Sequence, residues 1–277
     1  TTGANNTAVG SDALLANTTG SNNVAVGFGS ADALTTGNSN VAMGYNSLGS
    51  DTLGDRAVAI GLNALASQNF TSSTDNYNIG IGYAAGAAVT TGLYNTLIGG
   101  LAGDAQTTAD HNVALGVSTL TTNTKANKNV AIGSNALSIF NVTSDTDTYN
   151  TAVGYGAGAA VTTGVQNTLI GGLAGDALVD AHFNTAVGYQ ALSTDTESNY
   201  NTAIGYRALL VANNTSSTNG YNVAVGADAG QAVTTGTLNT LIGGLAGDAI
   251  TTASNSTAVG YGSLTANTTG ASNTAVG

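Results

Sequence analysis

The chain has 277 residues and a formal net charge of −11, with 39 glycines and no proline, cysteine or tryptophan. Only 7% of its residues are charged, against roughly 25% in an ordinary soluble domain. Four Lys and Arg residues cannot form the basic patch that binds phosphate backbones or anionic membranes, which excludes nucleic acid as a partner. No apolar run reaches the ~18 residues of a membrane helix, so we expect no membrane insertion. Without cysteine the chain has no disulfide and no thiolate metal site.

A five-residue unit, Asn-(Thr/Val)-Ala-(Val/Ile)-Gly, recurs sixteen times between Asn6 and Gly277 with few variations. Its closing glycines show three equal spacings of seventeen and then one of twenty-one, as at Gly10, Gly27, Gly44, Gly61 and Gly82. The same series of spacings starts again at Gly82, which makes a larger repeat, the superrepeat, of seventy-two. The superrepeats span approximately 11–82, 83–154, 155–226 and, in part, 227–277. No linker or change of composition separates them, so we expect a single repeat array over 1–277.

The length of the repeat predicts the fold. A coil as short as the step from Gly10 to Gly27 cannot hold a strand, a helix and two connections, but it suits two short strands and two turns. We therefore predict an all-β parallel β-solenoid of sixteen coils. Each coil is seventeen or twenty-one residues long, as the spacing of the closing glycines indicates. The five-residue unit is one strand, and a second is expected after its glycine, where Leu48 and Leu137 are typical. Where Gly replaces this Leu, a residue such as Val89 is expected to fill the space.

The recurrent Asn at the head of each unit has its own prediction. A polar amide at the same place in every coil favours a ladder of stacked side-chain amides, or an Asx-type turn. Either arrangement would tie successive coils together through side chains as well as through the backbone.

Alternation within the unit assigns its two faces. Side chains of a strand point to opposite sides in turn. The fourth position is always large and aliphatic and the second is nearly always Thr or Val, so we assign both to the coil interior. The third position is then an outer apolar stripe, which a soluble monomer seldom exposes. We predict that this stripe contacts other copies of the chain. It includes Ala8, Ala25, Ala42, Ala59, Leu97, Ala131, Leu169, Ala203, Leu241 and Ala275.

Three stretches resemble a known family: Asn184-Thr-Ala-Val-Gly-Tyr-Gln-Ala-Leu192, Asn150-Thr-Ala-Val-Gly-Tyr155 and Asn201-Thr-Ala-Ile-Gly-Tyr-Arg-Ala-Leu209. They are similar to the YadA-like head repeat, typically Asn-Ser-Val-Ala-Ile-Gly, which marks trimeric autotransporter adhesins and has counterparts in phage tail fibres. The resemblance covers essentially all residues from Asn6 to Gly277, although the coils here are longer than the family's common spacing. It implies a left-handed parallel β-roll, three identical chains side by side, and a role in adhesion or in a fibre.

Residues that could carry chemistry are few and scattered. His111 and His182 lie on different coils, each shortly before an Asn-headed strand, without a metal-binding or catalytic motif beside them. The stretch Gly99-Gly-Leu-Ala-Gly-Asp104 lacks the glycine and aspartate spacing of the calcium-binding nonapeptide, so Asp104 is interpreted as a turn residue. We predict no catalytic, cofactor-binding or metal-binding residue and no cofactor, and we expect that the chain is not an enzyme.

The longer coils, which end at Gly82, Gly154 and Gly226, carry an Asn-x-Thr tripeptide at one shared position. Asn69, Asn141 and Asn213 each begin such a tripeptide eight residues after the closing glycine of the preceding unit. In a secreted protein these are acceptors for N-glycosylation. The three asparagines are therefore candidate glycosylation sites.

These observations favour a structural or adhesive fibre segment that is extracellular, at a cell surface or in a virion. We expect self-association, as a side-by-side homotrimer, an axial filament or both, and a host-surface or glycan receptor. One alternative is an ice-binding solenoid that uses its Thr pairs, such as Thr18-Thr19 and Thr90-Thr91; another is a non-catalytic shaft of a viral tail fibre. A polysaccharide-degrading tailspike ranks last, because it needs carboxylates clustered on neighbouring coils.

Overall fold

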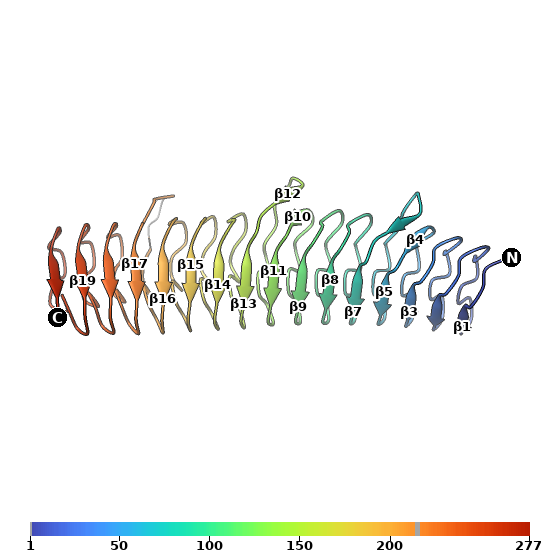
Figure 1. The fold of residues 1–277 in the computed structure, drawn as a ribbon, viewed down its shortest axis with the longest axis horizontal. Coiled ribbons are helices and arrows are strands. Elements are labelled where there is room, and N and C mark those ends of the chain that lie inside the picture. Colours follow the sequence, from blue (N-terminus) through green and yellow to red (C-terminus); the bar gives the residue numbers. More distant parts are fainter. Residues whose placement is uncertain (1, 214–216) are drawn as a thin grey trace. The chain divides into compact units, whose positions relative to one another are not determined.

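The computed structural model describes residues 2–213 and 217–277, which form two compact units. The first contains the chain up to Ser134 together with Asn141–Asp147, and the second contains Asn135–Phe140 together with Thr148–Gly277. In each compact unit the chain coils repeatedly and lays one short strand per coil beside the strand of the next coil (Figure 1). The described residues include no helix. The predicted all-β parallel β-solenoid of about sixteen turns is confirmed.

The strands of successive coils pair in parallel and in register. Thr7 pairs with Val24 and Ala8 with Ala25. The first unit holds β1 (Thr7–Val9), β2 (Val24–Val26), β3 (Val41–Met43), β5 (Val58–Ile60), β7 (Ile79–Ile81), β8 (Thr96–Ile98), β9 (Val113–Leu115) and β11 (Val130–Ile132), with the two-residue strands β4 (Gly54–Asp55), β6 (Thr74–Asp75), β10 (Ala126–Asn127) and β12 (Thr146–Asp147). The second unit holds β13 (Thr151–Val153), β14 (Thr168–Ile170), β15 (Thr185–Val187), β16 (Thr202–Ile204), β17 (Val223–Val225), β18 (Thr240–Ile242), β19 (Thr257–Val259) and β20 (Thr274–Val276).

The two faces of each strand are reversed relative to our prediction. The third residue of the five-residue unit points into the coil, while the second and fourth residues lie outside and are partly exposed. The assignment of the Ala and Leu stripe to an outer contact between chains is therefore wrong. Its members Ala25, Ala42, Ala59, Leu97, Ala131, Leu169, Ala203 and Leu241 are each 0% exposed within their own unit. Ala8 and Ala275, on β1 and β20, are exposed and half-buried respectively.

The reversal has a steric cause. By the two-residue period of a strand, the Asn and Gly at the ends of the unit point the same way as the third residue. The Asn side chains are buried, and a Cβ added at Gly27 would lie 2.5 Å from the carbonyl oxygen of Gly44 on the next coil. The φ of Gly27 is also +132°, which L side chains rarely adopt. The close approach of successive coils thus admits only Gly at the end of the unit, and the β-branched residues are directed outward, where no backbone of the next coil restricts them.

The segment after each glycine consists of turns, so the predicted second strand is wrong. Asn46 and Leu48, two and four residues after Gly44, both have the left-handed backbone conformation, with φ of 52° and 54°. This alternation curls the chain back on itself and points the Leu side chain inward, where Leu48 is fully buried. The recurrent Leu therefore belongs to the core, but it lies on a turn.

The Asn ladder is confirmed. The backbone N–H of Asn40 donates to Oδ1 of Asn23 on the preceding coil at 2.9 Å. Its own Nδ2 donates to the carbonyl oxygen of Gly54 at 2.9 Å, so each amide joins two coils. The same pattern holds in the second compact unit. The ladder is interrupted at Ala57 in the first compact unit and at Ser256 in the second, where these residues replace Asn. Buried amides whose hydrogen bonds are satisfied fix the register of the coils.

Two ionisable side chains of the interior, Asp51 and Asp195, are completely buried at 0% exposed, and Asp55 is 7% exposed. Asp195 accepts a hydrogen bond from the backbone N–H of Ser198 at 3.1 Å. Asn123 occupies the equivalent place in its own coil and accepts from the N–H of Ala126 at 2.9 Å. Burial raises the pKa of the Asp51 and Asp195 carboxyl groups above 3.8, the value for an exposed Asp, because desolvation disfavours the charged form.

Candidate interaction surface

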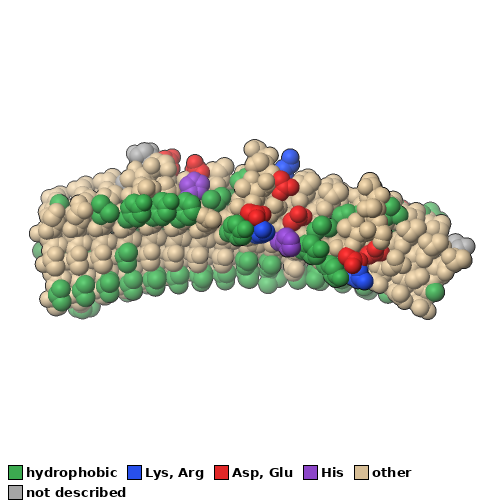
Figure 2. Space-filling view, turned by 45° about the horizontal axis from the view of Figure 1, so that its top comes forward, with side chains coloured by type: hydrophobic (Ala, Val, Ile, Leu, Met, Phe, Trp, Pro, Cys, Tyr) green, Lys and Arg blue, Asp and Glu red, His purple; other side chains and the backbone are tan. Residues whose placement is uncertain are grey.

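The most extensive regular surface is what we call the outer strand face, made by the second and fourth residues of every five-residue unit. No residue at either position is charged in any of the sixteen units. The fourth position places an aliphatic side chain on every strand, and among the more exposed are Met43 at 40%, Leu115 at 41% and Ile242 at 40%. In each unit Figure 2 shows hydrophobic side chains in rows along the stacking direction. Rows of apolar side chains that are partly exposed in this way are typical of interaction sites.

Aromatic side chains flank the outer strand face on both sides. One row, the pre-Asn row, consists of the aromatic residues that directly precede the Asn of a five-residue unit, and the other, the post-Gly row, of those that directly follow a closing Gly; neither row has an aromatic residue on every coil. In the pre-Asn row Tyr77 stacks on Tyr94, and Tyr94 on His111, with ring centroids 5.9 and 4.7 Å apart. In the post-Gly row Phe28 stacks on Tyr45 at 5.5 Å. Residue types alone gave no reason to expect these stacks, although the spacing of the aromatic residues, which follows that of the closing glycines, could have indicated them.

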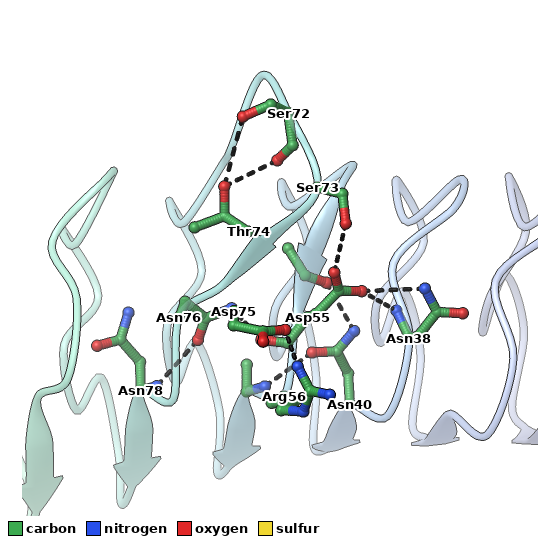
Figure 3. Close-up of polar contacts among 12 residues, drawn as sticks. Asn38, Asn40, Asp55, Arg56, Ser72, Ser73, Thr74, Asp75, Asn76 and Asn78 are labelled. Atoms are coloured by element: carbon green, nitrogen blue, oxygen red, sulfur yellow. Dashed lines mark hydrogen bonds and ion pairs between the residues drawn. The ribbon is translucent and has the colours of Figure 1, made fainter.

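The longer coils add small polar sites beside the pre-Asn row. Where the first of them meets the preceding coil, Asp55 accepts hydrogen bonds from the N–H of Asn38 and from Oγ of Ser73, each at 2.6 Å, and Arg56 forms an ion pair with Asp75 (Figure 3). The Arg56 guanidinium also lies 5.6 Å from the ring centre of Tyr77. One superrepeat later, Lys128 and Asp147 form the corresponding ion pair. These pairs are exposed, and each joins a longer coil to the coil before it.

The candidate glycosylation sites lie in similar settings. Asn69 is exposed and its Oδ1 accepts from Oγ1 of Thr52 at 2.9 Å. Asn141 and Asn213 are half-buried and accept in the same way from Thr124 and Thr196. The remainder of the third tripeptide, residues 214 and 215, lies outside the described residues. Glycosylation of the three asparagines stays a prediction.

The two histidines are not at equivalent positions. His111 directly precedes its Asn and stacks on Tyr94, whereas His182 is two residues before Asn184. Nδ1 of His182 accepts from the N–H of Val165 at 3.1 Å, and its Nε2 lies 3.4 Å from Oδ1 of Asp180. Asp104 is half-buried in a turn. Across the described parts of the chain, no three His, Cys, Asp or Glu side chains are grouped to hold a metal ion, and no pocket is present.

Comparison with known proteins adds no relative: no family model matches the chain, and no curated protein matches it significantly. No helix able to cross a membrane occurs in 2–213 or 217–277. The fold and its surfaces define the chain as a β-solenoid repeat protein, whose distinctive features are the uncharged outer strand face and the aromatic rows beside it.

Proposed function

We propose that this chain is a segment of an extracellular or virion fibre, in which identical chains associate side by side through the outer strand face. The observation that carries the proposal is the row of partly exposed aliphatic side chains in each compact unit, with one such side chain on each strand. No charged residue occurs at the second or fourth position of any five-residue unit. Burying such a row against another chain removes apolar surface from water at about 25 cal/mol per Å². Three chains in a left-handed β-roll is the arrangement that the resemblance to the YadA-like head repeat implies.

In this proposal the chain acts by shape and repetition, without catalysis or a cofactor. The surfaces away from the contact remain accessible for adhesion to a host surface or a glycan receptor. End-to-end stacking into a filament stays a prediction.

The test compares two substitutions that place a carboxylate on an exposed isoleucine. Ile204 is 38% exposed on the outer strand face, and Ile139 is 46% exposed on a turn. Light scattering should give a multiple of the 26.9 kDa chain mass for the wild type, with three chains expected. Ile204→Asp should shift the particle to the monomer, whereas Ile139→Asp should leave it unchanged. A wild-type monomer at all concentrations would contradict the proposal.

A second candidate, ice binding, is supported by one observation. Thr151, Thr168, Thr185 and Thr202 occupy the second position of four successive strands and pair in register. Adjacent strands repeat at about 4.8 Å, so these threonines form a regular rank. By contrast, the pairs such as Thr18-Thr19 and Thr90-Thr91 lie at bends. Thermal hysteresis that is lost in Thr168→Tyr would favour ice binding, and wild-type protein without hysteresis would reject it.

A further inference from the structure

Six tyrosines form three stacked pairs on successive coils. Tyr77 and Tyr94 have ring centroids 5.9 Å apart, Tyr189 and Tyr206 6.0 Å, and Tyr200 and Tyr221 5.1 Å. The ring planes within a pair are 13° to 17° from parallel. The two rings of each pair are therefore nearly parallel and stacked on neighbouring coils.

The backbone holds these pairs in place. Tyr200 and Tyr221 precede Asn201 and Asn222, whose ladder bond links N–H to Oδ1 at 3.2 Å, and strands β16 and β17 pair in register directly after them. Tyr200 and Tyr221 are 40% and 47% exposed. Both residues can thus be reached by a reagent in solution, while the distance between the side chains is fixed by the fold.

We propose that these pairs are sites of oxidative cross-linking, in which each pair becomes a dityrosine within one chain. The oxidant is hydrogen peroxide, activated by a haem peroxidase. Each phenol loses one electron and one proton to give a phenoxyl radical. The two radicals combine through a new carbon–carbon bond between ortho positions. The hydrogen on each bonded ortho carbon then moves as a proton to the phenol oxygen, which restores both aromatic rings. One peroxide accepts the two electrons and two protons and is reduced to two waters.

The bond would join coils that are neighbours in space but distant along the sequence. A bridge from Tyr200 to Tyr221 closes a loop of the chain, as a disulfide does, and limits the conformations open to the unfolded chain. The chain contains no cysteine, so this is a covalent link between coils that its residues permit. The inference does not depend on the proposed fibre function.

The experiment treats the purified chain at low concentration with hydrogen peroxide and a haem peroxidase. The expected product shows dityrosine fluorescence, and its mass is lower by two hydrogen atoms for each bridge. In a denaturing gel it still migrates as a single chain. Peptide mapping should find Tyr200 joined to Tyr221. The Tm of the product should rise.

Matched variants locate the reaction. Tyr221→Phe should abolish the bridge to Tyr200, because phenylalanine has no phenol to oxidise. Tyr261→Phe is the control, since Tyr261 has no stacked ring among the described residues. Phe183 stacks on Tyr200 at 4.8 Å, so Phe183→Tyr combined with Tyr221→Phe should restore a bridge at the new pair. Circular dichroism checks the fold of each variant.

Three results would overturn the proposal: no dityrosine in the wild type, cross-links only between separate chains, or a bridge yield that Tyr221→Phe leaves unchanged.

Discussion

Two kinds of coil fill the same interior in different ways. In an Ala-centred coil, Ala42 lies at the middle of the strand and Leu48 on the turn that follows. In a Leu-centred coil, Leu97 takes the strand position and the turn carries Gly103. A Cβ added at Gly103 would lie 2.8 Å from Cδ2 of Leu97, and one added at Gly86 on the preceding coil 2.7 Å from its Cδ1. One leucine thus occupies the space that turn leucines fill elsewhere.

The comparison shows that both kinds of coil fill the same interior space. The leucine that fills this space comes from the turn in one kind and from the strand in the other. The Leu97 arrangement returns at Leu169 and Leu241, each between two turn glycines, which explains why a stretch of sequence repeats once in each superrepeat. Val89 is fully buried and would lie 3.3 Å from a Cβ at Gly86, so the expectation that it fills space there is confirmed. Dense packing requires such exchanges, because interiors tolerate few voids.

The largest expected effect comes from breaking this exchange at Leu169. Leu169→Ala should lower the free energy of unfolding by about 2–5 kcal/mol, because it leaves a cavity between Gly158 and Gly175. Gly175→Leu alone should also destabilise, since its Cβ would lie 2.7 Å from Cδ2 of Leu169. The double variant relieves this contact but not the one with Cδ1 of Leu178, 2.8 Å from the same Cβ, and it places Leu at a φ of 55°, which Leu192 tolerates at 54°.

Urea denaturation of the four proteins measures the coupling. The double variant should be more stable than the sum of the single effects predicts, by about 0.5–3 kcal/mol. Additive effects would mean that Leu169 and the turn do not share one space.

An intermediate effect is expected at the Asn ladder, which both kinds of coil share. Asn112 is fully buried, and its Oδ1 accepts from the N–H of Asn129 at 2.9 Å. Asn112→Ala leaves that N–H unpaired, at a cost of about 1–3 kcal/mol. Asn112→Ser should cost less, since Ser256 occupies a ladder position and accepts from Asn273. Equal midpoints for the two variants in urea would contradict the ladder's energetic role.

The smallest effect concerns the buried carboxyl of Asp195. Its pKa is raised in the folded chain by desolvation, so the folded state binds the proton more readily than the unfolded state. The charged form is therefore destabilising above the folded pKa, and this penalty disappears as the pH falls through that pKa towards the unfolded value of 3.8.

Asp195→Asn removes the penalty and keeps an acceptor for the N–H of Ser198, as Asn123 does in its own coil. We expect its Tm to exceed that of the wild type by a few degrees at neutral pH, with a smaller difference in acid. A difference that grows as the pH falls would contradict the assigned direction of the pKa.

The sequence predicted the solenoid and the Asn ladder, because both follow directly from the period of the repeat. It misled on the faces of the strand, where the size of Val and Ile at the second and fourth positions suggested a core. A signal for the correct assignment was present: Leu97, Leu169 and Leu241 occur where the turn carries Gly, which indicates that the third position and the turn share one interior. The second strand was mispredicted because the left-handed conformation of residues such as Leu48 is rare outside Gly and Asn.

The most direct test of the central claim, that the outer strand face is where chains meet, is an electron-microscopy reconstruction of the unmodified protein. It should contain several chains side by side, with three expected, and the second and fourth residues of each unit should face the shared axis. A single solenoid whose outer strand face is in contact with solvent along its whole length would contradict the claim.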